Sequence, residues 1–147
     1  MKVSLVLLAS ARSDSNTLKA VKTLLPFKEF DLIDLREKNI VHFDYKNRPD
    51  DDFLSIAEAM TKADVLVFAT PVYWYSMSGI MKVFFDRLTD LITTSKPLGR
   101  SLAGKEVYLV AKGSDPELPE CFEEPFKKTC EYFNMKYVEA FYSCDKK

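Results

Sequence analysis

Histidine and cysteine are scarce in this sequence. Its 147 residues include one histidine, His42, and three cysteines, Cys121, Cys130 and Cys144. A single histidine excludes His-based metal clusters. An odd number of cysteines without a Cys-x-x-Cys spacing argues against a disulfide scaffold, a zinc site and a dithiol redox pair. The sequence therefore predicts no metal site, and thiols of this kind fit best in a reducing cytoplasm.

An excess of charge of either sign is also absent. Lys plus Arg number 21 and Asp plus Glu number 22, which gives a net charge of −1 at pH 7. Electrostatic attraction to nucleic acid or to an anionic membrane depends on a basic excess. No apolar run approaches the ~20 residues of a transmembrane helix. We expect the partners to be small molecules or other proteins, with no nucleic acid and no membrane.

The sequence does contain a regular alternation of strand and helix patterns. Apolar runs typical of buried strands in a parallel sheet fall at residues 3–9, 30–35, 65–69, 107–111 and 137–142. Apolar residues with helical spacing lie between them, at residues 18–25, 53–60, 80–92 and 122–133. Pro125 either begins the last helix or kinks it. The stretches 37–52 and 97–104 are predicted to be loops. The alternation predicts an α/β fold in one domain, residues 1–147, with helices on both faces of a parallel sheet.

The segment between the first strand and the first helix is a candidate phosphate loop. A helix N-terminus offers unpaired backbone N–H groups and a partial positive charge, which together attract anions. Hydrogen bonds would come from Ser10, Ser15, Asn16 and Thr17, and Arg12 would add a full positive charge. The alternative is that Ser15 or Asn16 only caps the helix and that Arg12 is a solvated surface residue.

A second candidate segment follows the third predicted strand. Residues 71–79 place three consecutive aromatic residues, Tyr73, Trp74 and Tyr75, in a loop rather than in the core. Exposed rings of this kind suit a flat aromatic ligand, whose heteroatoms the backbone N–H groups of the loop can reach. The alternative is a rigid loop whose rings cover the end of the sheet or form a subunit contact.

These two loops are expected to meet at one edge of the sheet. Ligands of doubly wound sheets bind outside the carboxyl ends of the strands, where the strand order reverses. Three predicted loops qualify, at residues 10–17, 71–79 and 112–116.

The two segments resemble those of the NAD(P)H-dependent FMN reductases, which have a flavodoxin-like fold. The family pattern Ser-x-Arg-x-x-Ser-Asn-Thr is matched by residues 10–17. The flavin-ring loop of the family is matched by residues 70–74, by Ser78 and Gly79, and by Lys82, Asp86 and Arg87. Two departures are Ala9, where family members often have glycine, and the absence of cysteine from residues 39–52, where some relatives bind an iron–sulfur centre. The resemblance covers the first two thirds of the chain most closely.

The resemblance implies a five-stranded parallel sheet of order 2-1-3-4-5 and FMN as the cofactor. It assigns the phosphate to Ser10, Arg12, Ser15, Asn16 and Thr17, and the isoalloxazine ring to Pro71, Val72, Tyr73, Trp74, Lys112, Gly113 and Ser114. It places Lys82, Asp86 and Arg87 on a helix surface or a subunit interface. A nicotinamide would pass hydride to the flavin, which would reduce a second substrate such as a quinone or a free flavin, without a catalytic side chain. A homodimer is also implied. Separately from the resemblance, two loop arginines, Arg48 and Arg100, are candidate partners for the 2′-phosphate of NADPH; the alternative is that they face solvent, as lone loop arginines usually do.

Two other functions compete with this interpretation. A flavodoxin-type electron carrier would bind FMN without reductase activity, but such carriers tend to have strongly acidic surfaces, and the net charge here is −1. A flavodoxin-like module that has lost its ligand would serve as an interaction protein, but Arg12, Asn16 and Thr17 are intact. A phosphatase of similar topology needs a cysteine nucleophile in the first loop, which the sequence lacks.

Overall fold

The fold alternates strands and helices along the whole chain. A computed structural model describes residues 2–12, 15–46 and 49–145. Within these residues the elements are β1 (Ser4–Leu8), α1 (Asn16–Leu24), β2 (Asp31–Asp34), the 3-10 helix η1 (Leu35–Glu37), α2 (Phe53–Lys62), β3 (Val65–Pro71), α3 (Gly79–Arg87), the 3-10 helix η2 (Leu88–Leu91), α4 (Lys96–Arg100), β4 (Glu106–Gly113), α5 (Glu124–Tyr132) and β5 (Lys136–Cys144).

The five strands form one sheet of order β2-β1-β3-β4-β5, and every neighbouring pair is parallel. This confirms the predicted order. The chain moves from β1 outward to β2 and then crosses back to β3 on the other side of β1. The order therefore reverses between β1 and β3, where doubly wound sheets hold their ligands.

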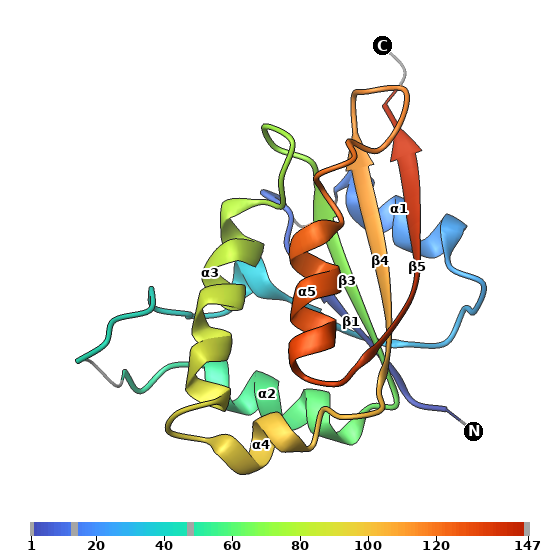
Figure 1. The fold of residues 1–147 in the computed structure, drawn as a ribbon. Coiled ribbons are helices and arrows are strands. Elements are labelled where there is room, and N and C mark those ends of the chain that lie inside the picture. The colour runs from blue at the N-terminus through green and yellow to red at the C-terminus, as the bar shows by residue number, and fades with distance from the viewer. Residues whose placement is uncertain (1, 13–14, 47–48, 146–147) are drawn as a thin grey trace.

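Two hydrophobic cores lie on opposite faces of the sheet. Alternate residues of β1 serve both, because side chains of a strand point to opposite faces in turn: Leu5 and Leu7 belong to one core, and Val6 and Leu8 to the other. The larger core packs α2, α3 and α5 against the sheet, and α1 supplies the smaller one. Figure 1 shows α3 and α5 in front of the sheet and α1 behind it. Burial on both faces explains the near-continuous apolar runs of the strands.

Two elements differ from the predictions, and one open alternative is decided. The helix predicted over residues 80–92 ends at Arg87 and continues as the tighter helix η2. A short helix, α4, forms inside the stretch 97–104 that was predicted to be a loop, with Pro97 in its first turn. Pro125 lies in the first turn of α5, so the alternative of a helix that begins there is confirmed. Proline suits a first turn because the backbone N–H that it lacks would have no partner there.

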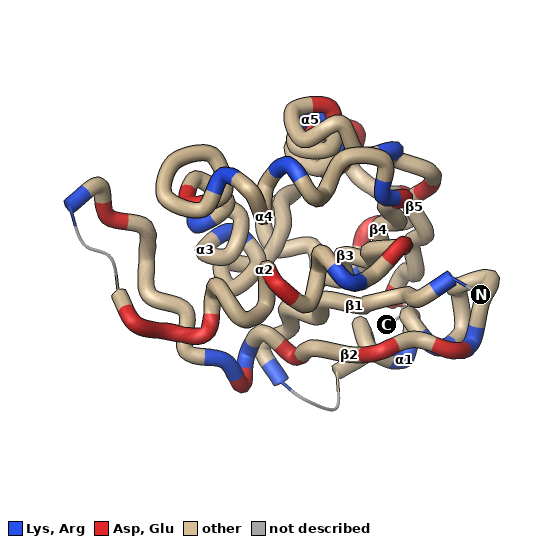
Figure 2. The backbone as a smooth tube through the Cα atoms, turned by 90° about the horizontal axis from the view of Figure 1, so that it is seen from below, with Lys and Arg blue, Asp and Glu red and all other residues tan. Residues whose placement is uncertain are grey.

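Basic and acidic residues are interspersed around the backbone in the view of Figure 2. Among the helices of the described residues, none combines the length and the hydropathy that crossing a bilayer requires.

Candidate FMN-binding site

A cavity of about 290 Å³ lies at the carboxyl edge of the sheet, where the loops after β1, β3 and β4 meet. These are the upper ends of the strands in Figure 1. Eleven of the twelve residues that the sequence assigns to FMN line it: Ser10, Arg12, Ser15, Asn16, Thr17, Pro71, Val72, Tyr73, Lys112, Gly113 and Ser114. The remaining residue, Trp74, is not part of the lining. Ser13 and Asp14, which complete the candidate phosphate loop, lie outside the described residues.

The phosphate end of the cavity is the N-terminus of α1. Ser15 is the N-cap of this helix, and its Oγ accepts a hydrogen bond from the backbone N–H of Leu18 at 3.1 Å. Capping does not exclude a role in anion binding, because a hydroxyl that accepts one hydrogen bond can still donate its own proton. Ser10 and Thr17 are buried beside it, whereas Arg12 and Asn16 are exposed. The positive end of the helix dipole and five polar residues therefore face one space.

The opposite wall is built from the ends of β3 and β4. The backbone N–H of Val72 donates to the carbonyl of Lys112 at 2.8 Å, so the two strands remain paired up to the cavity. Gly113 leaves no room for a side chain here. A Cβ atom on it would lie 2.8 Å from the Oη of Tyr142 and 3.2 Å from the Cβ of Val72. Glycine thus allows Tyr142 and Val72 to close in behind the cavity wall.

The aromatic residues after β3 form a tight turn. The backbones of Tyr73 and Ser76 exchange hydrogen bonds of 2.9 and 3.2 Å. The two residues between them, Trp74 and Tyr75, have φ values of 50° and 69°. Positive φ at both central positions is the geometry of a type I′ turn, which bulky residues seldom adopt. Trp74 is 91% exposed at the tip of this turn.

Ser78 ties the aromatic segment to the candidate phosphate loop. Its Oγ donates to the carbonyl of Ala9 at 2.7 Å and accepts from the backbone N–H of Met81 at 3.2 Å. Its own backbone N–H donates to the Oγ1 of Thr70 at 3.0 Å. Ser78 is buried, so these bonds are shielded from water. One serine therefore caps α3 and fixes the relative position of the two loops.

The family to which this chain belongs is decided by a match to a protein-family model. The model described as NADPH-dependent FMN reductase matches residues 1–146. The chain belongs to this family. The resemblance seen in the sequence is thereby confirmed, and with it the oxidoreductase class and FMN as the cofactor of the family.

Three known proteins are similar to this chain in sequence or in fold. The putative NAD(P)H-dependent FMN-containing oxidoreductase YwqN of Bacillus subtilis is 36% identical over 67 residues, which cover 44% of this chain and 37% of YwqN. The match thus spans well under half of that relative. The structure of the Trp repressor binding protein from Bacillus subtilis has a TM-score of 0.74 at 24% identity and covers 98% of this chain and 88% of its own. The general stress protein 14 of Treponema denticola, solved in complex with FMN, has a TM-score of 0.68 at 18% identity and covers 95% and 84%. The two solved structures support the flavodoxin-like fold.

Asp145 also lies at this cavity, although the sequence interpretation did not assign it to FMN. Its backbone N–H donates to the carbonyl of Gly113 at 2.6 Å, and its carboxylate forms an ion pair with Lys112 at 3.0 Å. It lines the cavity. The strand order contained a signal: β5 is parallel to β4, so the residues that follow β5 must lie beside the loop after β4.

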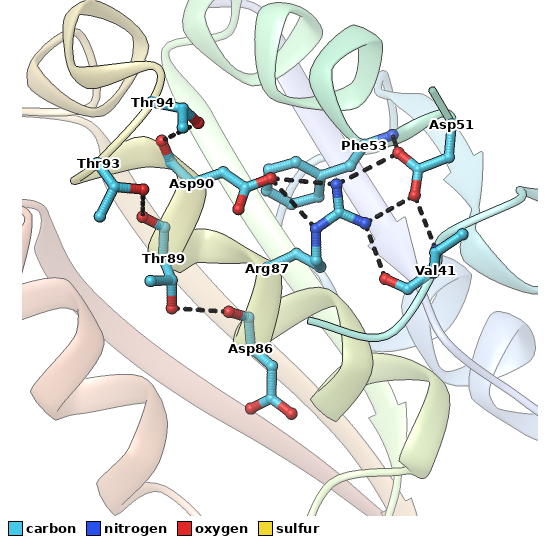
Figure 3. Close-up of polar contacts among 9 residues, drawn as sticks. All are labelled: Val41, Asp51, Phe53, Asp86, Arg87, Thr89, Asp90, Thr93 and Thr94. Atoms are coloured by element: carbon cyan, nitrogen blue, oxygen red, sulfur yellow. Dashed lines mark hydrogen bonds and ion pairs between the residues drawn. The ribbon is translucent and has the colours of Figure 1, made fainter. Parts of the chain in front are cut away.

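Of the three residues predicted to lie on a helix surface or a subunit interface, two are exposed and one is not. Lys82 and Asp86 form an exposed ion pair on α3. For Arg87 the prediction is wrong, since its side chain is 3% exposed. Its guanidinium binds the carboxylates of Asp51 and Asp90, and its charge must be matched because an unpaired buried cation is strongly unfavourable (Figure 3).

The predictions for the remaining residues have mixed outcomes. Arg100 lies on α4, at the end of the molecule opposite the cavity (Figure 1), so the structure separates it from the site. Arg48 lies outside the described residues. Cys130 is buried, and burial raises the pKa of its thiol to about 12. This thiol is therefore unreactive at neutral pH.

Proposed function

We propose that residues 1–147 act as a single FMN-binding domain that oxidises NAD(P)H and reduces a small-molecule acceptor. The observation that carries the proposal is the convergence of eleven residues, from three separate segments, around one cavity at the strand ends. A cavity of about 290 Å³ is at the small end of the roughly 300–1,000 Å³ range of ligand sites. It would enclose part of FMN and leave the rest of the ring accessible to substrates.

The donor set suits the phosphate of FMN. Ser10, Ser15 and Thr17 present hydroxyls at the helix N-terminus, where a dianion interacts favourably with the helix dipole. Arg12 would add a planar pair of donors. Pro71, Val72 and the backbone beside Gly113 would contact the ring. The likeness to a protein crystallised with FMN supports this assignment.

The residues around the cavity bind and orient; none of them is required to move a proton. FMN supplies the redox chemistry, since it accepts hydride from a nicotinamide and passes electrons to an acceptor. The tight turn at Tyr73 and the hydrogen bonds of Ser78 would hold the ring wall rigid, so that one face stays open. We also propose a homodimer, from the likeness to the family. A cytoplasmic location is proposed because the three cysteines form no disulfide. Sedimentation of the purified protein would test the dimer.

FMN binding is the first test. We expect the purified protein to bind FMN, measured as quenching of flavin fluorescence during titration. Arg12→Ala should weaken binding about tenfold, because a charge-assisted hydrogen bond to the phosphate is lost. Arg100→Ala removes the same charge at the far end of the molecule and should leave the affinity unchanged. Failure of the unmodified protein to bind FMN would refute the proposed function.

Turnover separates the reductase from the electron carrier. With FMN bound, the protein should oxidise NADH or NADPH when a quinone or free flavin is supplied as acceptor. A carrier would bind FMN equally well but would oxidise the nicotinamide only after a separate reductase is added. Steady-state assays with both nucleotides and both acceptors would also reveal which pair is preferred.

A further inference from the structure

The carboxylate of Asp145 occupies part of the cavity in which the proposed function places FMN. Its Oδ1 lies 3.0 Å from the Nζ of Lys112 and accepts a hydrogen bond from the Nδ2 of Asn16 at 3.4 Å. Both partners are residues that the family resemblance assigns to the ligand. The backbone of Asp145 is tied to the carbonyl of Gly113, so the carboxylate is presented from the end of β5.

These contacts reduce the positive charge that the cavity offers to an anion. Lys112 is 15% exposed on its side chain, and its ammonium also donates to the Oγ of Ser143 at 3.1 Å. It is thus held by two partners at the end of β5. Arg12 remains as the exposed cation that lines the cavity, while the amide of Asn16 is directed to the carboxylate.

A phosphate at the N-terminus of α1 would lie close to this carboxylate. Two anions in a partly enclosed site repel each other, and the repulsion is larger than it would be in bulk water. The phosphate would also compete with Asp145 for Asn16. Neither effect acts on a ligand that has the same ring and ribityl chain but no phosphate.

We infer that Asp145 is an internal anion that sets the affinity and the charge preference of the cavity. It competes with the phosphate of the ligand for Asn16, neutralises Lys112, and so weakens the binding of phosphorylated flavin relative to unphosphorylated flavin. This inference rests on the proposed function for the identity of the flavin. The competition itself concerns any phosphate-bearing ligand.

The test compares three ligands with and without the carboxylate. Asp145→Asn removes the charge and keeps the shape of the side chain. We expect it to tighten FMN binding by roughly three- to tenfold, since one unit charge a few ångströms away is removed and Lys112 is released. Riboflavin binding should stay within error. Inorganic phosphate, followed by its effect on the melting temperature, should bind more tightly. The gain for FMN should shrink as salt is added, because screening weakens charge–charge effects.

Glu139→Gln is the matched control. Glu139 is an exposed carboxylate on β5, the strand that Asp145 follows. It does not line the cavity, and its removal changes the net charge equally. It should alter the affinity for none of the three ligands. If Asp145→Asn misfolds, which a loss of the unfolding transition would show, Asp145→Ser replaces it. The same changes in affinity for the three ligands are then expected.

The outcomes separate this inference from the proposed function. The inferred competition between Asp145 and the phosphate would be overturned if Asp145→Asn bound FMN and riboflavin more tightly to the same extent, or if it did not bind FMN more tightly. Weaker binding of both flavins by this variant would indicate instead that Asp145 accepts a hydrogen bond from a ligand hydroxyl. If the unmodified protein binds no flavin but Asp145→Asn still strengthens phosphate binding, the competition stands and the proposed function fails. If no variant binds flavin or phosphate, both fail.

Discussion

Replacement of Arg87 by methionine is expected to lower the free energy of unfolding by about 3–5 kcal/mol, because it leaves buried carboxylates without their partner. The guanidinium NH1 binds Asp51 Oδ2 at 2.6 Å and the carbonyl of Val41 at 2.7 Å. Its Nε and NH2 bind Asp90 Oδ2 at 3.2 and 3.1 Å. The side chain of Asp51 is 2% exposed. Figure 3 shows this cluster joining the loop before α2 to the end of α3.

The neighbouring ion pair on the same helix is the control. Lys82 and Asp86 are both exposed, and pairs of this kind contribute little, about 0–1 kcal/mol. Lys82→Met should therefore change stability by less than about 1 kcal/mol. Urea denaturation of the three proteins measures the difference. Similar values for Arg87→Met and Lys82→Met would show that the buried cluster is not needed for stability.

The same cluster predicts a dependence on pH. Burial alone would raise the pKa of Asp51, but hydrogen bonds from Arg87 and from the backbone of Val41 and Phe53 outweigh it, so the pKa lies below its ordinary value. A carboxyl with a lowered folded-state pKa stabilises the fold above its unfolded-state pKa, and the stabilisation is lost as pH falls through the folded-state value. The difference in the free energy of unfolding between the unmodified protein and Arg87→Met should therefore be largest at neutral pH and should become smaller in acid.

Local sequence patterns could not have revealed this cluster. Arg87 and Asp51 are separated by 36 residues, and the pairing depends on how the loop after η1 folds back over α3. By contrast, the strands were predictable, because burial on both faces leaves a near-continuous apolar run. The same holds for the cavity: once a parallel sheet is assumed, the loops after β1, β3 and β4 must share one edge. Trp74 was placed with the ring by motif alone, and side-chain direction at a turn depends on backbone angles that spacing does not specify.

Replacing the two aromatic residues at the tip of the turn should make the protein more stable. Trp74 and Tyr75 both have positive φ, a region that is unfavourable by roughly 1–2 kcal/mol for an ordinary residue. Asn followed by Gly is the preferred pair for a type I′ turn. The double variant Trp74→Asn, Tyr75→Gly should therefore raise the free energy of unfolding by about 2–3 kcal/mol.

An alanine pair at the same positions separates backbone strain from the loss of the rings. Trp74→Ala with Tyr75→Ala removes the same side chains but keeps the unfavourable φ values, so it should give no gain. Equal stability of the two double variants would show that the positive φ values do not destabilise the fold.

Both double variants should bind FMN with an affinity close to that of the unmodified protein, because Trp74 does not line the cavity. A tenfold loss would instead show that Trp74 covers the bound ring, as the sequence motif predicts. Strained residues that persist on a surface without stabilising the fold are typical of functional sites, and these two variants measure that strain directly.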